Sequence, residues 1–599
     1  MSIPYTSPVA AETPDGIRTH RAGRLAAAAV LAVCFLIFLV SVSAERNALL
    51  DDTYITLRYA KHLAEGRGLV WNIGGERVEG FTSMLHVALL AGAIRAGVAP
   101  ETAATAIALL ATLGTALLLI VIARRQFGLL ALPAALIVGL YLVDRTTVGL
   151  TSIALETQLF VFLLCLCYLL AISFVERPGP GRAIALAAAT FASVLCRPDG
   201  AIYGTGIYAV LGIYLIAAAR RHEIAPGYVK AYLSSVVLLA GLGLAYGFAK
   251  YQYFGYLLPN PFYVKSNQVS LAGAGFVLRY LEHIAVRLGP LVAVLGLFVS
   301  AGSVKGIFRN PRTAVKVALT LVPPALALAY YTTITHEVGG SHRFSYPTYF
   351  YLVIAAAAVA TLAFKRLPDL NRTRLAALAA AMVAILFATD GNWRSLLRGG
   401  AARPPDEFSE YHFQIARVLE ATRLGPRMTI LCDAAGIIPF VTEVNLLDRV
   451  GLNDNFLSGR HPIGPEEREQ YIWSRNPDVY IGFEPPASPG AARMEDDPRM
   501  KTGYLKHLMQ FHRTGGVVII ENRTFLMWPE LWHTRMRELR DNWVWLGEIH
   551  WPGWRISGLK SFVYVRRNSP HFDILAPALK QLVAVEPERV DLNRTPSSL

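Results

Sequence analysis

The sequence predicts a polytopic α-helical membrane protein with a C-terminal α/β domain, and three observations support this prediction. Of the 599 residues, 54% are hydrophobic and 17% are charged, whereas soluble domains carry about 25% charged residues. Apolar runs without Lys or Arg occupy residues 25–44, 103–123 and 156–175, and a bilayer span takes about 20 such residues. After residue 390 no such run follows, and the composition becomes polar.

Basic residues set the predicted topology, because Lys and Arg are enriched in short cytoplasmic loops. Arg18, Arg21 and Arg24 place the N-terminal tail, residues 1–24, in the cytoplasm, so that residues 45–81 form an outer loop. Later basic clusters and polar loops alternate along the chain, as expected if each span leads from one side of the membrane to the other. We therefore expect about eleven spans, at 25–44, 103–123, 129–143, 156–175, 183–196, 201–218, 231–249, 288–303, 317–333, 346–364 and 375–390.

One further apolar stretch, residues 83–99, fits this topology only if it does not cross the membrane. His86 and Arg95 interrupt it. We interpret it as a juxtamembrane or re-entrant helix that belongs to the outer loop. If it crossed instead, every later span would be inverted, and the arginine clusters at 124–125 and 220–221 would face the outside.

The C-terminal part has a different pattern. Residues 391–599 carry short strand-like runs, MTILC, DVYIGF, GGVVIIE and FVYVRR, which alternate with amphipathic stretches such as 407–424. This alternation predicts an α/β domain, which the topology places on the outer face, beyond a transmembrane domain at 25–390. The part has no G-x-G-x-x-G and no P-loop, so nucleotide binding is not supported.

The charge balance and the cysteines narrow the class of partner. The net charge of +14 is explained by positive inner loops and a basic outer domain, with attraction to anionic lipid phosphates as a second contribution. No basic stripe interleaved with aromatic residues occurs, so nucleic acid is not an expected partner. The five cysteines form neither a disulfide framework nor a zinc spacing.

The outer loop opens on two adjacent carboxylates, Asp51 and Asp52. Successive helical residues point about 100° apart, so one carboxylate can face a substrate while the other caps a helix. Arg58 follows on the same helical face as Asp51 and can keep that carboxylate ionised, as a general base requires. A cap and solubilising turn at the headgroup level is the alternative. The pair can also hold Mg²⁺ or Mn²⁺ with phosphate oxygens.

Further ionisable residues lie at the predicted outer membrane edge, where a partnered functional role is the default interpretation. Glu156 begins a span, and Arg197 and Asp199 belong to the sequence CRPDG. Arg197 can pair with Asp199, with Glu156 or with a phosphate. Glu79, in GGERVEGFT, can order the outer loop or bind a sugar, and as a single exposed glutamate it favours the first of these roles.

Two more outer loops offer cations. Lys265, in the aromatic loop 250–267, can reach a lipid phosphate or make a simple headgroup contact, and His342 with Arg343 beside two glycines can form an anion site. Carboxylates beside such cations suit one reaction in particular. A lipid-linked phosphate leaves, an acceptor hydroxyl attacks, and an aspartate accepts the hydroxyl proton.

The stretch DDTYITLRYAKHLAEGRGLVWNIGGERVEGFTSMLH resembles the first outer loop of the GT-C glycosyltransferases that use polyprenyl-phosphate sugars. It is most similar to the mycobacterial terminal β-1,2-arabinofuranosyltransferase group. LETQLF, CRPDG, YFGYLLPNPFYVK, the G-x-x-R-F loop, CDAAGIIPF and LLDRVGLND follow in the family's order, so the resemblance covers residues 51 to about 455.

This resemblance implies a GT-C fold and an inverting transferase of the plasma membrane. The enzyme would move arabinofuranose from decaprenyl-phosphoryl arabinose to a cell-envelope glycan or glycoprotein on the outer face. The resemblance also implies that Asp51 is the base and that Asp52 supports it. One departure concerns the sugar, because Ser341 and His342 follow Gly339-Gly340 where relatives often carry an acidic, tryptophan-containing loop. The donor sugar could therefore be another pentose or a hexose.

Two other function classes compete with this interpretation. A transporter or flippase would need ionisable residues near the middle of its spans or inverted repeats, but the polar residues here collect at one face. A non-catalytic anchor that presents the α/β domain would leave the acidic loop without a role.

Overall fold

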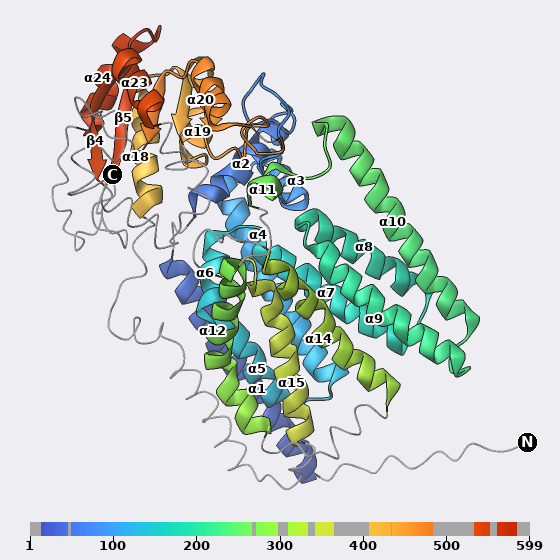
Figure 1. Ribbon diagram of the computed structural model, residues 1–599. Coiled ribbons are helices and arrows are strands. Elements are labelled where there is room, and N and C mark those ends of the chain that lie inside the picture. The colour runs from blue at the N-terminus through green and yellow to red at the C-terminus, as the bar shows by residue number, and fades with distance from the viewer. Residues whose placement is uncertain are drawn as a thin grey trace, which may run out of the picture.

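The computed structural model describes residues 14–45, 49–265, 271–296, 310–333, 342–364, 407–432, 434–461, 463–482, 532–550 and 560–583. A helical bundle forms one part, and a sheet with flanking helices forms the other (Figure 1). Helix α2 (Asp51–Ala64) lies between the two parts. The predicted fold class, an α-helical membrane protein joined to an α/β part, is confirmed in these ranges.

The bundle is built from helices that pack around a large apolar core. They are α1 (Pro14–Ala44), α4 (Pro100–Val121) with the π-helical turn η1 (Ile122–Gln126), α5 (Ala131–Val143), α6 (Arg145–Ile153), α7 (Thr157–Glu176), α8 (Pro180–Cys196), α9 (Gly200–Arg220), α10 (Pro226–Phe254), α12 (Leu271–Gly296), α14 (Pro311–Tyr331) and α15 (Tyr349–Phe364).

Six helical segments in the described ranges are long and apolar enough to span a membrane. They are Gly23–Ala44, Pro100–Gln126, Thr157–Glu176, Gly200–Arg220, Pro226–Phe254 and Pro311–Tyr331. Each corresponds to a span that the hydropathy of the sequence predicts. Aliphatic side chains such as Val237, 71% exposed, and Leu244, 76% exposed, lie on the outer surface of α10, as expected for a lipid-facing helix.

Other predicted spans take a different form. The span 129–143 corresponds to α5, which is bent by 51° against α6 and passes the length test only together with it. The bend is at Asp144, whose Oδ1 accepts hydrogen bonds from the amides of Thr146 and Thr147 and so begins a new helix.

Three predicted spans match less closely. The spans 183–196 and 346–364 are shorter apolar helices. Of the span 288–303, residues 288–296 form the end of α12, which begins at Leu271, and the rest lies outside the described residues. The span 375–390 lies outside the described residues.

The stretch 83–99 forms α3 (Met84–Arg95), a helix of 12 residues. At 1.5 Å per residue its length is about 18 Å, well short of a hydrocarbon core of about 30 Å. This supports the interpretation that α3 belongs with the predicted outer loop. The two together, residues 45–99, are called the outer segment below.

The C-terminal part contains a five-stranded mixed sheet in the order β2-β1-β3-β5-β4. Strands β1 (Thr429–Cys432), β2 (Asn445–Asp448) and β3 (Val479–Gly482) are parallel, and β5 (Lys560–Arg566) and β4 (Trp543–His550) are antiparallel additions.

Three of the strand-like runs in the sequence are strands here, and GGVVIIE lies outside the described residues. The sequence analysis did not identify β2 and β4. Helices α18 (Glu407–Ala421), α19 (Ile437–Thr442), α20 (Pro465–Ser474), α23 (Trp532–Asn542) and α24 (Phe572–Val583), with the 3₁₀ turn η3 (Gly425–Arg427), accompany the sheet.

The outer segment and the C-terminal part share one apolar core. Tyr54 of α2 makes ring contacts with Phe413 and Phe440, at centroid distances of 5.5 and 5.1 Å. Trp71 is 1% exposed, and its Nε1 donates to the carbonyl of Leu446. The C-terminal part is therefore built directly onto the first outer loop.

Helix α2 holds the short helix α19 at both ends. The Asp51 carboxylate accepts hydrogen bonds from the amides of Gly436 (2.9 Å) and Ile437 (2.7 Å), at the start of α19. The Arg58 guanidinium donates to the carbonyls of Pro439 and Val444, at the end of α19 and just beyond it. An anion at the amino end of a helix and a cation at its carboxyl end both interact favourably with the helix dipole.

Two glycines allow this close approach. A Cβ at Gly436 would overlap the carbonyl carbon and oxygen of Asp51, and a Cβ at Gly80 would overlap the side chain of Asn453. These glycines belong to the sequences CDAAGIIPF and GGERVEGFT. The loop that follows Asp51 and the C-terminal part therefore meet backbone to backbone at Gly436 and backbone to side chain at Gly80.

The hydrogen bonds by which Asp51 and Arg58 of α2 hold α19 are called the clamp below. They predict that Asp51→Asn destabilises the protein. The substitution removes a buried charge that accepts two amide hydrogen bonds, and a hydrogen bond to a charged group contributes about 1.5–3 kcal/mol. The apparent melting temperature of the purified chain in detergent should fall. The matched control is Asp52→Asn, one residue on, whose side chain is 27% exposed and which should lower it far less. Equal shifts would contradict the clamp.

Candidate functional site

The ends of several helices meet around a buried ion pair. Arg197 follows α8, and Asp199 precedes α9. The guanidinium donates from Nε and Nη2 to the two oxygens of Asp199, at 3.0 and 2.9 Å. Tyr331, the last residue of α14, donates its hydroxyl to the same carboxylate. Arg197 therefore takes its expected partner Asp199, and the pair is fixed in place.

A second arginine lies at the same site. Arg343 is 3.6 Å from the Asp52 carboxylate through Nη1 and 3.7 Å from the Glu156 carboxylate through Nη2. Glu156 precedes α7 and is 4% exposed. Thus Asp52 of the outer segment, Glu156 of the bundle and the arginine before η2 (Tyr346–Thr348) come together from distant parts of the chain.

The two arginines share an aromatic neighbour and retain donor capacity. Their guanidinium carbons lie 5.3 Å (Arg197) and 5.7 Å (Arg343) from the centre of the Phe344 ring. Nη1 of Arg197 and Nε of Arg343 are buried and have no hydrogen-bond partner among the described residues. A buried donor without a partner costs free energy, so two such donors indicate a ligand with acceptor oxygens.

The charges at this site act on Glu156. Burial alone would raise the pKa of this carboxyl, but Arg343, Arg197 and His86 outweigh burial and lower it. Glu156 is therefore an anion that balances one of the two arginines. His86 of α3 is 1% exposed, and neither of its ring nitrogens has a hydrogen-bond partner in the described part of the chain.

Asp51 and Asp52 have different environments. Both oxygens of Asp51 accept backbone amides of the C-terminal part, whereas Asp52 faces Arg343 and remains partly exposed. One aspartate caps a helix, as the spacing allows, but the capped helix is α19 and not the one that follows in sequence. The pair does not present a shared set of oxygens for Mg²⁺ or Mn²⁺. The described residues contain no group of three or more His, Cys, Asp or Glu side chains that could hold a metal ion.

The expected roles of Arg58 as a phosphate ligand and as the partner of Asp51 need correction. Its Nε donates to the carbonyl of Trp71, and its terminal nitrogens reach Asn72 and the two carbonyls of the clamp. The side chain is 1% exposed. Its donors are thus used within the protein, and Arg58 positions the C-terminal part.

Glu79 is not the exposed side chain that the sequence suggests. It is 2% exposed, and Oε2 lies 2.9 Å from Nζ of Lys250 in α10. Its backbone amide donates to the Tyr256 hydroxyl, and its carbonyl accepts the amide of Asn260. Burial raises the pKa of Glu79 to about 7, against the opposing effect of Lys250. These contacts hold Glu79 within the loop and fit the first of its two predicted roles, the ordering of the loop.

The two remaining cations lie apart from the site or outside the description. His342 lies beside α12, with ring centroids 5.1 Å from His283 and 5.7 Å from Tyr280. It does not join Arg343 in one anion site. Lys265 ends the short helix α11 (Asn260–Lys265), and its side chain lies outside the described part of the chain.

Three residues that the sequence did not indicate lie beside predicted site residues. Lys250 is the partner of Glu79, Tyr331 binds Asp199, and Phe344 lies against both arginines. Lys250 had a detectable signal, since it is the lone cation near the end of the apolar run that forms α10. Tyr331 and Phe344 had none, because aromatic residues at a membrane edge are common.

Comparisons with known proteins give the following result. No family model and no curated protein matches the chain. Two solved structures are similar to it, both of ArnT from Cupriavidus metallidurans, and each comparison covers 76% of this chain and 92% of that chain. The structure bound to undecaprenyl phosphate has a TM-score of 0.49 at 13% identity, and the apo structure has 0.45 at 16%. Both scores are below 0.5, so this similarity carries no argument about fold or function.

The buried pair of Glu79 and Lys250 predicts strong coupling. Lys250→Met should destabilise the protein, because it leaves the buried Glu79 carboxyl without its cation, and the loss should be larger above pH 7, where Glu79 is ionised in the native chain. Adding Glu79→Gln should recover part of this loss, which the apparent melting temperatures of the two single variants and the double variant would measure. Additive losses would contradict the pairing.

The raised pKa of Glu79 also gives this residue a pH dependence with a definite sign. The folded state binds its proton more tightly than the unfolded state, whose pKa is about 4.5. The contribution of Glu79 to stability is therefore complete below pH 4.5 and is lost as the pH rises to about 7. The difference in melting temperature between the native chain and Glu79→Gln should fall over this range, and a constant difference would contradict the assignment.

Proposed function

We propose that this chain is a GT-C glycosyltransferase that transfers a sugar from a polyprenyl-phosphate donor to a hydroxyl acceptor. The observation that carries the proposal is the pair of buried donors without a partner, on Arg197 and Arg343, beside the partly exposed carboxylate of Asp52. The two arginine donors can bind an anionic leaving group, and the Asp52 carboxylate can accept a proton. The amino ends of α7 and α9 add partial positive charge at the same place.

The proposed reaction is a single displacement. The acceptor hydroxyl oxygen attacks the anomeric carbon of the donor sugar, and the bond from that carbon to the phosphate oxygen breaks. Polyprenyl phosphate leaves with the electron pair, and the hydroxyl proton passes to Asp52. Arg343 and Arg197 stabilise the charge that develops on the phosphate. Attack from the face opposite the phosphate inverts the anomeric configuration.

The geometry favours Asp52 over Asp51 as the base. A general base must reach the proton it accepts, and both Asp51 oxygens are occupied by the amides of Gly436 and Ile437. Asp51 acts on the reaction indirectly, because it stabilises the folded arrangement in which α2 places Asp52, and the folded fraction of a variant keeps that arrangement. This reverses the order that the family resemblance implies for the two residues.

The donor sugar we propose is arabinofuranose on a decaprenyl carrier, and the acceptor is a cell-envelope glycan or glycoprotein. Both follow from the resemblance of residues 51–455 to the mycobacterial arabinofuranosyltransferase group. The departure after Gly340 makes another pentose or a hexose the competing donor. The proposed location is the plasma membrane, with the N-terminus in the cytoplasm and the C-terminal part outside, where lipid-linked sugars rather than nucleotide sugars are available.

A transfer assay tests the proposal and separates the two aspartates. Purified chain in detergent would receive synthetic decaprenyl-phosphoryl arabinofuranose and an arabinan oligosaccharide, and transfer would be followed by mass. General-base catalysis contributes about 10²–10⁴-fold, so Asp52→Asn should lose about that factor while keeping its melting temperature. Asp51→Asn should lose activity only in proportion to the unfolded fraction.

The outcomes of this assay are distinct. Full activity of Asp52→Asn, or a loss in Asp51→Asn that exceeds its unfolded fraction by orders of magnitude, would contradict the role of Asp52. Transfer from a hexosyl donor and not from the arabinosyl donor would change the sugar and keep the mechanism. Transport of an intact lipid-linked sugar without transfer would replace the enzyme by a flippase.

The phosphate role of Arg343 predicts a change in product inhibition. Decaprenyl phosphate should compete with the donor, and Arg343→Gln should weaken this inhibition about 10- to 100-fold, since a hydrogen bond to a charged group contributes about 1.5–3 kcal/mol. The control is Arg95→Gln, which removes the same charge from the exposed end of α3 and should leave inhibition unchanged. Equal inhibition of the native chain and Arg343→Gln would exclude this contact.

A further inference from the structure

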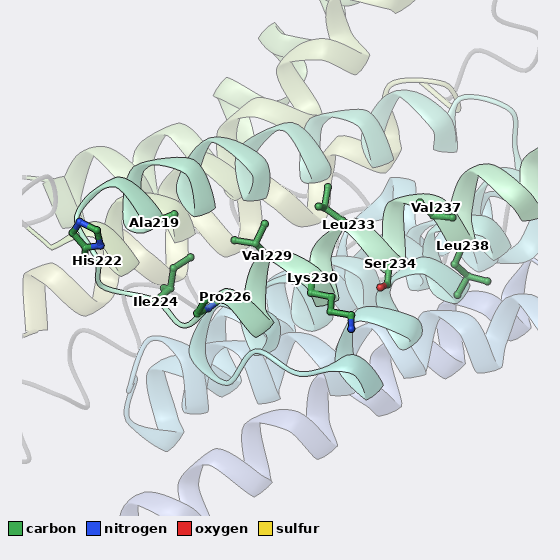
Figure 2. Close-up of a pocket in the computed structure, with 10 residues that line it drawn as sticks. All are labelled: Ala219, His222, Ile224, Pro226, Val229, Lys230, Leu233, Ser234, Val237 and Leu238. Atoms are coloured by element: carbon green, nitrogen blue, oxygen red, sulfur yellow. The ribbon is translucent and has the colours of Figure 1, made fainter.

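A long groove lies between the end of α9 and the first half of α10, away from the candidate site. Figure 2 shows its lining residues, which run from His222 in the turn along α10 to Leu238. The groove has a volume of about 1100 Å³ and is open on one side. Because α9 has 21 residues and begins at Gly200, directly after Asp199, its far end lies about 30 Å from the candidate site.

The walls of this groove are aliphatic over most of its length. Ile224, Val229, Leu233 and Val237 line it, and Leu233 and Val237 are 54% and 71% exposed. Small-molecule pockets enclose about 300–1,000 Å³, so the groove exceeds that range and suits an elongated apolar ligand. In a membrane-spanning helix pair this ligand is a lipid acyl chain.

The charges at the groove select the headgroup. His222 and Lys230 are the two ionisable residues among the ten that line it. Arg220 and Arg221 precede His222 and are exposed. The carboxylates nearby, Glu176 and Glu223, line a separate pocket of about 370 Å³ instead. The mouth of the groove therefore presents cations beside an aliphatic wall.

The contact between α9 and α10 keeps the groove in shape. The Tyr232 hydroxyl donates to the carbonyl of Tyr208 at 2.9 Å, and a Cβ at Gly212 would overlap this hydroxyl. The two helices are thus pinned at Tyr232, next to Lys230 and Leu233.

We infer that this groove binds an anionic glycerophospholipid in the leaflet opposite the candidate site, with its phosphate near Lys230 and its chains along α10. Basic pockets between transmembrane helices bind anionic lipid headgroups in this manner. The site is independent of the proposed reaction, because it lies at the other end of α9 and shares no residue with the arginine pair.

The test compares two lipids with identical acyl chains. Purified full-length chain in detergent would be mixed with phosphatidylglycerol or phosphatidylcholine, and retained lipid would be counted by native mass spectrometry. The native chain should retain phosphatidylglycerol at about tenfold lower lipid concentration. The double variant Lys230→Ala/His222→Ala should lose this preference. The control is Arg125→Ala, which removes an exposed cation from η1, directly after α4, and should keep the preference.

A second variant tests the acyl wall. Leu233→Trp fills the groove without a change in charge and should lower the retention of both lipids by at least fivefold. Equal retention of the two lipids by the native chain would overturn the inference. So would an unchanged preference in the double variant, an equal loss in Arg125→Ala, or a mass that shows a second copy of the chain in place of lipid.

Discussion

The grip of α2 on α19 is the interaction on which the candidate site depends. Asp51 satisfies amides at the start of α19, and Arg58 satisfies carbonyls at its end and beyond. Burial lowers the pKa of Arg58 to about 9, and the backbone dipoles of opposite sign that each charge meets offset part of the cost of burying it. Two charges seven residues apart on one helix therefore fix the C-terminal part against the outer segment, and Asp52 is held beside Arg343 as a result.

The bundle contributes to the same site by a different principle. Helix ends, and not helix faces, supply its residues: Glu156 precedes α7, and Arg197 and Asp199 occupy the turn between α8 and α9. Each of these charges has a partner of opposite sign, so they can stay in a buried region at modest cost. The exceptions are the two guanidinium donors, one on Arg197 and one on Arg343, that have no hydrogen-bond partner among the described residues.

Much of this arrangement could be predicted from the sequence, for identifiable reasons. Hydropathy located the long spans because uninterrupted apolar runs admit one interpretation, and charges at their ends marked Glu156, Arg197 and Asp199. Sequence could not separate Asp51 from Asp52, because the amides that occupy Asp51 come from residues 436 and 437. The pairing of Glu79 with Lys250 was missed for the same reason, since burial across 171 positions leaves no local pattern. Strand β2 is no shorter than β1 and β3, but only two of its residues, Leu446 and Leu447, are apolar, so its sequence NLLD does not stand out as a strand.

The shared core of the outer segment has a consequence for biosynthesis. Residues 436 and 437 follow Asp51 by 385 and 386 positions, and ribosomes add about 5–20 residues per second. The apolar side of α2 is therefore made on the order of 20–80 seconds before the part of the chain that covers it. During that interval Tyr54 and Trp71 lack their cover, and the site cannot form. Nascent chains of this protein therefore expose this apolar surface until residue 437 has been made, which makes the surface a natural target for chaperones.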